Sequence, residues 1–270
     1  MREVSFGQYY PCNSFIHKCD PRAKILFLAL YITCIFLCEN FYGLLFCALA
    51  FFIVVLCAKL KLSTLLQSVK AILFLLLFTS VLNLFFHKGK TVVFQWWIVT
   101  ITKEGIYFTV FLAVRLFLLV LSSSLLTLTT SPVALTDGVE SLLTPLKWIG
   151  FPVHVLALIM SLALRFIPIL TEETNRIMNA QKARGADFER GGLVKRVKAI
   201  LPILIPLLIS ALRRAGEVGD AMDSRCYWSS KIRIKYKKLT FGWRDLIVLV
   251  FSGILLAGVI LIKIYILAMI

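Results

Sequence analysis

Long runs of apolar residues restrict the possible fold of this 270-residue chain more than any other feature. The runs contain almost no charged side chains and lie at 25–38, 41–58, 71–86, 106–128 and 246–262. A chain segment that crosses a bilayer must satisfy its backbone polar groups internally, and a helix does so. We therefore predict an all-α integral membrane protein with about five transmembrane helices and the lipid bilayer as its surroundings.

Basic residues predict how these helices are oriented. The net charge is +16, and the Lys and Arg residues concentrate between positions 165 and 238. Short loops rich in Lys and Arg are retained in the cytoplasm. We expect a cytoplasmic N-terminus, a cytoplasmic region over 131–242 and an outer C-terminus. In a chain that is 60% hydrophobic, this clustering argues against nucleic-acid binding. The alternating stretch TVVFQWWIVTIT, at 91–102, is interpreted as a short hairpin on the outer side.

The cytoplasmic region contains two further apolar segments, 153–164 and 199–212. Each has only about a dozen apolar residues, and two spans here would export the basic segment 171–198. We predict two long cytoplasmic helices, kinked or bounded by prolines, that form an antiparallel or crossed pair. Their apolar stripes are Leu162, Phe166, Ile169, Leu170 and Ile177 in the first, and Val194, Val197, Leu201, Leu204, Leu208 and Leu212 in the second. The expected parts are therefore a membrane part over 1–131, a cytoplasmic region with the two long helices over 132–242 and a last transmembrane helix over 243–270.

A short motif is repeated where these two helices are expected to end. AQKARG at 180–185 and AMDSRC at 221–226 share the pattern A-x-x-[AS]-R-[GC]. Small residues allow the backbone of a partner to approach closely, and a guanidinium offers five hydrogen-bond donors in a rigid fork. The simpler alternative is that both arginines only complement the negative ends of two helix dipoles. The candidate site residues are Ala183, Arg184 and Gly185 in the first copy, and Ser224, Arg225 and Cys226 in the second.

Three segments resemble a known family: DPRAKILFLAL, LALRFIPILTEETNRIMNAQKARGADF and AMDSRCYW. They are similar to the transmembrane T component, EcfT, of energy-coupling factor (ECF) transporters, in the CbiQ/EcfT family. The resemblance implies a membrane scaffold that binds two cytosolic ABC-type ATPases through its two motifs. It also implies a separate membrane S component that takes up a vitamin or other micronutrient. Cys226 departs from the family pattern, which has glycine there. Because residues other than glycine rarely adopt a positive φ, the cysteine argues against a requirement for a positive φ at this position.

The resemblance implies a non-catalytic subunit in the plasma membrane of a prokaryote. The sequence lacks the pattern G-x-x-x-x-G-K-[ST], so we expect the partner ATPases to bind ATP and this chain to hold no cofactor or metal. The alternatives are an intramembrane enzyme or a simple channel. An enzyme needs a cluster of acids, bases or metal ligands, and the candidates are Asp137, Glu140, His154, Glu172 and Glu173, whose spacing is typical of solvated helix faces.

Arg115 is a charged residue within the fourth apolar run. A charge at the centre of a span costs roughly 2.5–3.5 kcal/mol on insertion scales, so a partner is expected. We predict that Arg115 pairs inside the helix bundle, or alternatively that it faces the S component.

Overall fold

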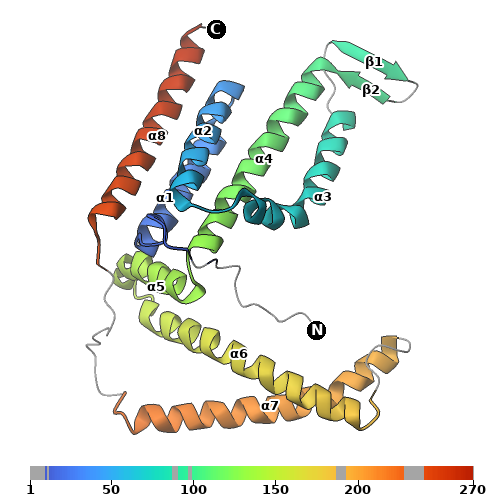
Figure 1. The fold of residues 1–270 in the computed structure, drawn as a ribbon, viewed down its shortest axis with the longest axis vertical. Coiled ribbons are helices and arrows are strands. Elements are labelled where there is room, and N and C mark those ends of the chain that lie inside the picture. Colours follow the sequence, from blue (N-terminus) through green and yellow to red (C-terminus); the bar gives the residue numbers. More distant parts are fainter. Residues whose placement is uncertain are drawn as a thin grey trace. The chain divides into compact units, whose positions relative to one another are not determined.

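The computed structural model describes residues 10, 12–86, 91–96, 99–186, 193–227 and 240–269 (Figure 1). The chain forms two compact units. The first, called here the membrane unit, comprises Met1–Val153 and Leu239–Ile270, and the second comprises His154–Lys238. Helices dominate both, so the all-α class is confirmed, with one two-stranded hairpin as the exception in the part that the structure describes.

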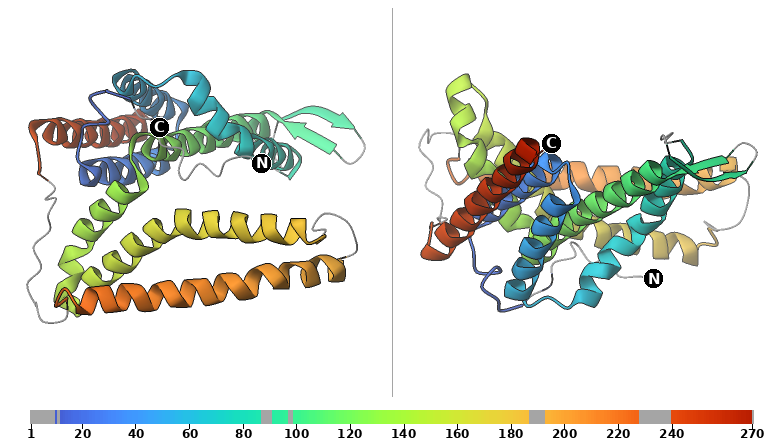
Figure 2. Two further views of the ribbon diagram at one scale, coloured as in Figure 1. Left: turned by 60° about the horizontal axis from the view of Figure 1, so that its bottom comes forward. Right: turned by 90° about the horizontal axis from the view of Figure 1, so that it is seen from above.

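The membrane unit consists of a helix bundle and the hairpin (Figure 2). Helix α1 contacts α2, α4, α5 and α8, and α3 packs along α4. The hairpin projects from the start of α4 and confirms that the alternating stretch forms a hairpin, while its position on the outer side stays a prediction. The elements are α1 (Pro21–Leu37), α2 (Phe41–Ala58), α3 (Leu62–Phe86), β1 (Val92–Trp96), β2 (Val99–Thr102), α4 (Lys103–Thr129), α5 (Pro132–Leu143), the 3-10 helix η1 (Thr144–Ile149) and α8 (Trp243–Met269).

Polar side chains fix the starts of these helices. The Asp20 carboxylate accepts the Arg22 backbone N–H at 2.9 Å, with Pro21 in the first turn of α1. Ser131 begins α5 in the same way, since its hydroxyl accepts the Ala134 N–H at 3.3 Å. Such caps satisfy backbone donors that have no partner within the helix. Short polar segments between the apolar runs therefore set where each helix begins.

The core of the membrane unit lies where α1, α2, α4 and α8 meet. Tyr31 is fully buried, and its hydroxyl donates to the backbone oxygen of Cys47 at 3.1 Å. Gly258 brings α8 close to α2, because a Cβ at this position would meet the Phe46 ring at 2.9 Å. These contacts hold the bundle together by close packing and one satisfied buried hydroxyl.

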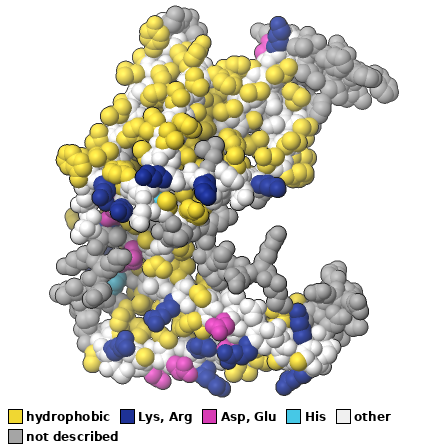
Figure 3. Space-filling model, in the orientation of Figure 1, with side chains coloured by type: hydrophobic (Ala, Val, Ile, Leu, Met, Phe, Trp, Pro, Cys, Tyr) yellow, Lys and Arg dark blue, Asp and Glu magenta, His cyan; other side chains and the backbone are white. Residues whose placement is uncertain are grey.

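In the part of the chain that the structure describes, four helices are long and apolar enough to cross a bilayer: α2, α4, α6 (Val153–Ala183) and residues Trp243–Ile266 of α8. Three of the five predicted spans are among them. The 17 residues of α1 reach only about 26 Å, less than the ~30 Å hydrocarbon core. The apolar part of α3 is limited to Ile72–Leu84. Figure 3 shows hydrophobic side chains over the visible face of the membrane unit, and most of its Lys and Arg side chains in this view gather at one end.

Helix α6 differs from expectation because its apolar stretch does not stop at residue 164. It continues through Phe166 and Ile167 to Leu170, with only Arg165 as a charged interruption. The predicted apolar length was therefore too short. Only 6% of its most apolar window is buried inside the structure. Which of the three expected parts lie in the membrane and which lies in the cytoplasm stays a prediction.

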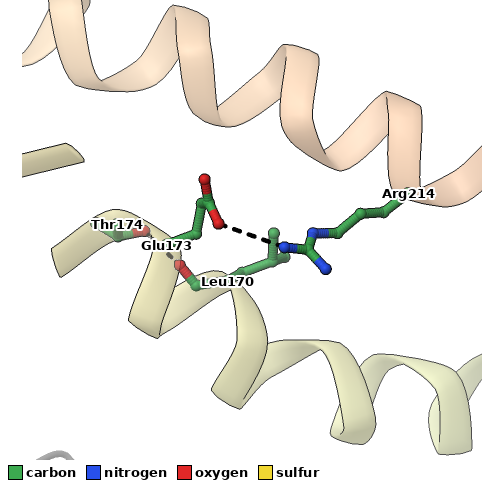
Figure 4. A network of polar contacts seen from close by, with 4 residues as sticks. All are labelled: Leu170, Glu173, Thr174 and Arg214. Atoms are coloured by element: carbon green, nitrogen blue, oxygen red, sulfur yellow. Dashed lines mark hydrogen bonds and ion pairs between the residues drawn. The ribbon is translucent and has the colours of Figure 1, made fainter. Parts of the chain in front are cut away.

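The second unit is a crossed pair of helices, α6 and α7 (Leu193–Asp223), that run in opposite directions (Figures 1 and 2). Both helices continue through their prolines. Arg214 of α7 donates to the Glu173 carboxylate of α6 at 3.3 Å (Figure 4). Glu173 was expected on the solvated face of α6, and this was wrong because it is half-buried against α7. The expected Gly191-Gly192 turn lies outside the described residues.

The apolar stripe expected on α7 points outward in the structure. The half-buried positions of α7 lie on another face and follow helical spacing. They are Ile203, Leu207, Ser210, Ala211, Arg214, Val218 and Met222. The predicted stripe was shifted because α7 carries apolar residues on two faces, and spacing alone does not rank them. The exposed members of the predicted stripe are Leu201, Leu204, Leu208 and Leu212, and the side chains of Val194 and Val197 lie outside the description. The stripe predicted for α6 is half-buried throughout.

Candidate functional site

The two arginine motifs follow directly after the two long helices. Helix α6 ends at Ala183, and Arg184 and Gly185 form the turn beyond it. Helix α7 ends at Asp223, and its motif residues Ser224, Arg225 and Cys226 form a corresponding turn. All six residues are exposed. The structure therefore puts each predicted motif at an exposed helix end.

The first motif forms a Schellman turn, a common way to end a helix. The Gly185 N–H donates to the Lys182 oxygen at 3.0 Å, and the Ala186 N–H donates to the Gln181 oxygen at 3.0 Å. Gly185 adopts the left-handed region with φ +89°. These are the two hydrogen bonds that define the motif, and glycine adopts this backbone without steric cost.

The second motif repeats this geometry although cysteine replaces glycine. The Cys226 N–H donates to the Asp223 oxygen at 2.9 Å, and the Tyr227 N–H donates to the Met222 oxygen at 3.1 Å. Cys226 has φ +53°, and Lys59 is the other non-glycine residue with positive φ in the described part of the chain. A left-handed conformation costs an L-residue roughly 1–2 kcal/mol. Cys226 therefore has the same left-handed backbone conformation as Gly185, although it carries a side chain.

The equivalent backbones give both arginines the same place at a helix end. Each is the last residue before the left-handed one, where the C-terminal carbonyls concentrate negative dipole charge. Within the described part of the chain, neither guanidinium has a hydrogen bond or an ion pair. Attraction to the dipole leaves most of the five donors of each side chain available to another molecule.

The two motifs lie at opposite ends of the helix pair (Figure 2). Each helix has 31 residues, and a straight helix of that length extends about 46 Å. Because α6 and α7 run in opposite directions, Arg184 and Arg225 are separated by approximately the length of the unit. One binding groove would not hold both, whereas two separate partner molecules would.

Sequence reasoning missed the residues that complete each turn. Ala186 and Tyr227 supply the second hydrogen bond of their turns, and both are half-buried. The signal was available, because each lies two residues after its arginine, where a Schellman turn requires a donor. Arg214 was also missed, since nothing in the pattern of α7 indicates a partner on α6.

The acidic residues and histidine considered for an intramembrane enzyme are distributed over two helices. Asp137 and Glu140 lie on α5, and His154, Glu172 and Glu173 lie on α6. Among the described residues there is no group of three or more His, Cys, Asp or Glu side chains placed to hold a metal ion. The expected lack of a cofactor stays a prediction.

Arg115 pairs inside the bundle, as the first of its two interpretations stated. Its guanidinium donates to the backbone oxygen of Cys38, at the end of α1, and lies over the Phe111 ring at 4.6 Å from the centroid. A helix C-terminus and an aromatic face both attract a cation. Arg115 therefore links α4 to α1.

Comparison with known proteins gives a family. The model of the CbiQ family, described as cobalt transport protein, matches residues 12–236. The chain belongs to the CbiQ family. Curated relatives named energy-coupling factor transporter transmembrane protein EcfT agree over nearly their full length. The Brevibacillus brevis protein is 50% identical over 94% of this chain and 96% of its own length. The Ruminiclostridium cellulolyticum protein is 44% identical over 97% and 98%, and the Lactococcus lactis protein is 41% identical over 93% and 94%.

Membership of the CbiQ family confirms the resemblance noted from three sequence segments. The family model ends at residue 236 and so includes α6, α7 and both arginine motifs. Together with the long apolar helices, it identifies the chain as a membrane protein of a transport family.

Proposed function

We propose that this chain is the transmembrane scaffold and coupling subunit of an ECF-type ABC importer. Two cytosolic ABC-type ATPases bind it, one at Arg184 and one at Arg225. A membrane S component supplies the binding site for a vitamin or other micronutrient. The observation that supports this most strongly is the pair of matched helix ends, with the same backbone turn at opposite ends of one helix pair.

The geometry suits the transmission of movement. A helix that ends in a Schellman turn has its last carbonyls satisfied, so its end resists fraying when a partner binds there. The forked guanidinium fixes orientation as well as position, because it forms parallel hydrogen bonds to a carboxylate or to carbonyl groups. The Glu173–Arg214 contact connects α6 and α7. Movement of either ATPase would therefore reach both helices.

The proposal includes a location and an orientation. We infer the plasma membrane of a prokaryote, with the N-terminus and the α6–α7 unit in the cytoplasm. The basic residues between 165 and 238, and the Lys and Arg side chains at one end of the membrane unit, support this through the preference of basic segments for the cytoplasm (Figure 3). The chain contributes binding surfaces, and the ATPases contribute nucleotide hydrolysis.

Copurification tests the proposal against its alternatives. The tagged chain is extracted from native membranes in mild detergent, and the copurifying proteins are identified by mass spectrometry. We expect two ABC-type ATPase subunits for each chain, together with a small membrane protein, and ATP hydrolysis by the complex. A chain that purifies without ATPases, yet supports ion flux or a chemical reaction in vesicles, would identify a channel or an enzyme and contradict the proposal.

A further inference from the structure

A cavity of about 250 Å³ lies inside the membrane unit, where α1, α2, α4 and α8 converge. Its lining is almost entirely apolar and includes Phe27, Phe51, Leu125, Val248 and Phe251. The cavity follows α4 from Thr129 to Ser122, a length of about 10 Å along the helix axis. It therefore extends along about two turns of α4.

Water is a poor occupant of this space. A buried water needs two to four polar partners, and an engineered apolar cavity of about 150 Å³ stays dry and binds benzene or xenon. The hydroxyls on the cavity wall already donate within their own helix, Ser122 to the Leu119 oxygen at 2.8 Å and Thr129 to the Leu125 oxygen at 2.8 Å. An apolar occupant fits better, and a bilayer supplies acyl chains around the protein.

One end of the cavity holds a buried cation. The Lys24 side chain lines this end, and its Nζ donates to the Thr129 oxygen at 3.0 Å, with longer contacts to Thr130 Oγ1 at 3.4 Å and the His17 oxygen at 3.5 Å. All three acceptors are uncharged. Burial lowers the pKa of Lys24 to about 8. At neutral pH it is therefore still mostly protonated.

Asp245 and Asp20 favour the charged form of Lys24, but they act from beyond ion-pair distance. Within the described residues, no carboxylate lies within ion-pair distance of its Nζ. Asp245 accepts the Asp20 N–H at 2.6 Å and the Gly242 N–H at 2.8 Å, and Asp20 caps α1. Both carboxylates thus serve the starts of α1 and α8. A buried charge without a close counter-ion favours a negatively charged ligand beside it.

We propose that this cavity binds the acyl chain of an anionic membrane lipid, with the negatively charged headgroup at the Lys24 end. The apolar wall accepts the chain, and the ammonium selects the charge of the headgroup. The lipid fills space between four helices and so acts as a structural ligand of the membrane unit. A phospholipid and a free fatty acid share this chemistry, and the experiment distinguishes them.

Photocrosslinking of the purified full-length chain tests the proposal. The chain is reconstituted in phosphatidylcholine vesicles that contain a small fraction of phosphatidylglycerol with a diazirine in one acyl chain. Labelled peptides are mapped by mass spectrometry. We expect labels on cavity residues such as Phe27 and Leu125. Unlabelled phosphatidylglycerol should compete about fivefold better than phosphatidylcholine, the factor expected for one lysine near an anionic headgroup. Stronger competition by oleate would assign the site to a free fatty acid.

Two variants on α8 form a matched pair for this experiment. Val248→Phe adds volume inside the cavity, whereas Val250→Phe adds the same volume at a side chain that is 52% exposed and outside the cavity lining. Val248→Phe should remove most labelling of cavity residues, and Val250→Phe should leave it unchanged. Equal labelling in the two variants, or labels confined to the exposed face of the bundle, would overturn the proposal.

The Lys24→Met variant distinguishes binding of the lipid headgroup by Lys24 from binding of the acyl chain by the apolar wall. In this variant the fivefold preference for phosphatidylglycerol should disappear while cavity residues remain labelled, and Lys24→Arg should restore the preference. Equal competition by both lipids in the wild type would refute the role of Lys24. If Lys24→Met does not fold, the Val248→Phe comparison and the wild-type competition still decide both parts.

Discussion

At the residue scale, the helix ends show how one substitution changes chemistry and keeps geometry. Cys226 occupies the position that corresponds to Gly185 in the other copy of the motif and has a backbone that glycine prefers, with φ +53°. The hydrogen bonds of its turn match those of Gly185. Both the pattern and the equivalence of the two copies were visible in the sequence. The positive φ was not, because cysteine at this position argues against it.

Substitutions at Cys226 and Gly185 test the free-energy cost of the left-handed backbone. Cys226→Gly should stabilise the end of α7 by about 1 kcal/mol, and Gly185→Ala should destabilise the end of α6 by about 1–2 kcal/mol. Hydrogen exchange of the Tyr227 and Ala186 amides measures these changes. Gly216→Ala is the control: Gly216 lies inside α7 with open space around it, and alanine there should stabilise by about 1 kcal/mol. Slower exchange in Gly185→Ala would contradict the account.

Lys24 gives a pH dependence with a definite sign. Its folded pKa of about 8 lies below the ordinary 10.5. Between these values the folded protein has released a proton that the unfolded chain still holds, so the free energy of unfolding rises with pH from about 8 to 10.5. Denaturant unfolding in detergent should show a smaller rise in Lys24→Met than in the wild type. The exposed Lys70→Met variant should keep the wild-type slope, and equal slopes in all three would refute the assignment.

At the element scale, α7 is an amphipathic helix with two apolar faces. One face, which includes Ile203 and Leu207, is half-buried. The other is exposed, with Leu204 and Leu208 at 55% and 56%. Helical periodicity predicted that α7 exists and is amphipathic. It could not predict which face turns inward, because that depends on α6 and on contacts such as Glu173–Arg214.

The two faces of α7 should respond differently to a charge. Leu204→Asp should leave the α6–α7 pair intact and lower the yield of the assembled complex, because the exposed row is free to contact another protein or lipid. Leu207→Asp should instead weaken the pair, since it puts an unpaired charge on the half-buried face that contacts α6. Cross-linking between α6 and α7 measures the pair, and copurification measures the complex. A wild-type complex yield from Leu204→Asp would show that the row has no partner.

At the scale of the whole molecule, apolar length and charge predicted a helical membrane protein with two further long helices. The alternation at 91–102 predicted its hairpin, and a repeated pattern located the arginine motifs at the ends of the two long helices. The limits of the spans were less predictable. Helix α1 is capped by Asp20 and ends after 17 residues, and α6 continues its apolar stretch to Leu170. These limits depend on caps and on neighbouring helices. The pairing of Arg115 with the end of α1 also depends on tertiary packing.

The central claim is that two separate arginines hold two separate ATPases. Removing one member of a buried charged contact typically costs about 2–5 kcal/mol. Arg184→Ala or Arg225→Ala alone should therefore leave the complex partly assembled, because the other helix end still binds. Arg→Lys should restore binding only in part, since an ammonium lacks the forked geometry.

The most direct measurement is ATPase pull-down and substrate uptake with the Arg184→Ala/Arg225→Ala double variant, after correct membrane insertion has been verified. The control is Arg176→Ala/Arg213→Ala, which removes the same charge from exposed positions on the same two helices. We expect the double motif variant to lose its ATPases or its uptake and the control to retain both. Normal pull-down and normal uptake by the motif variant would contradict the account.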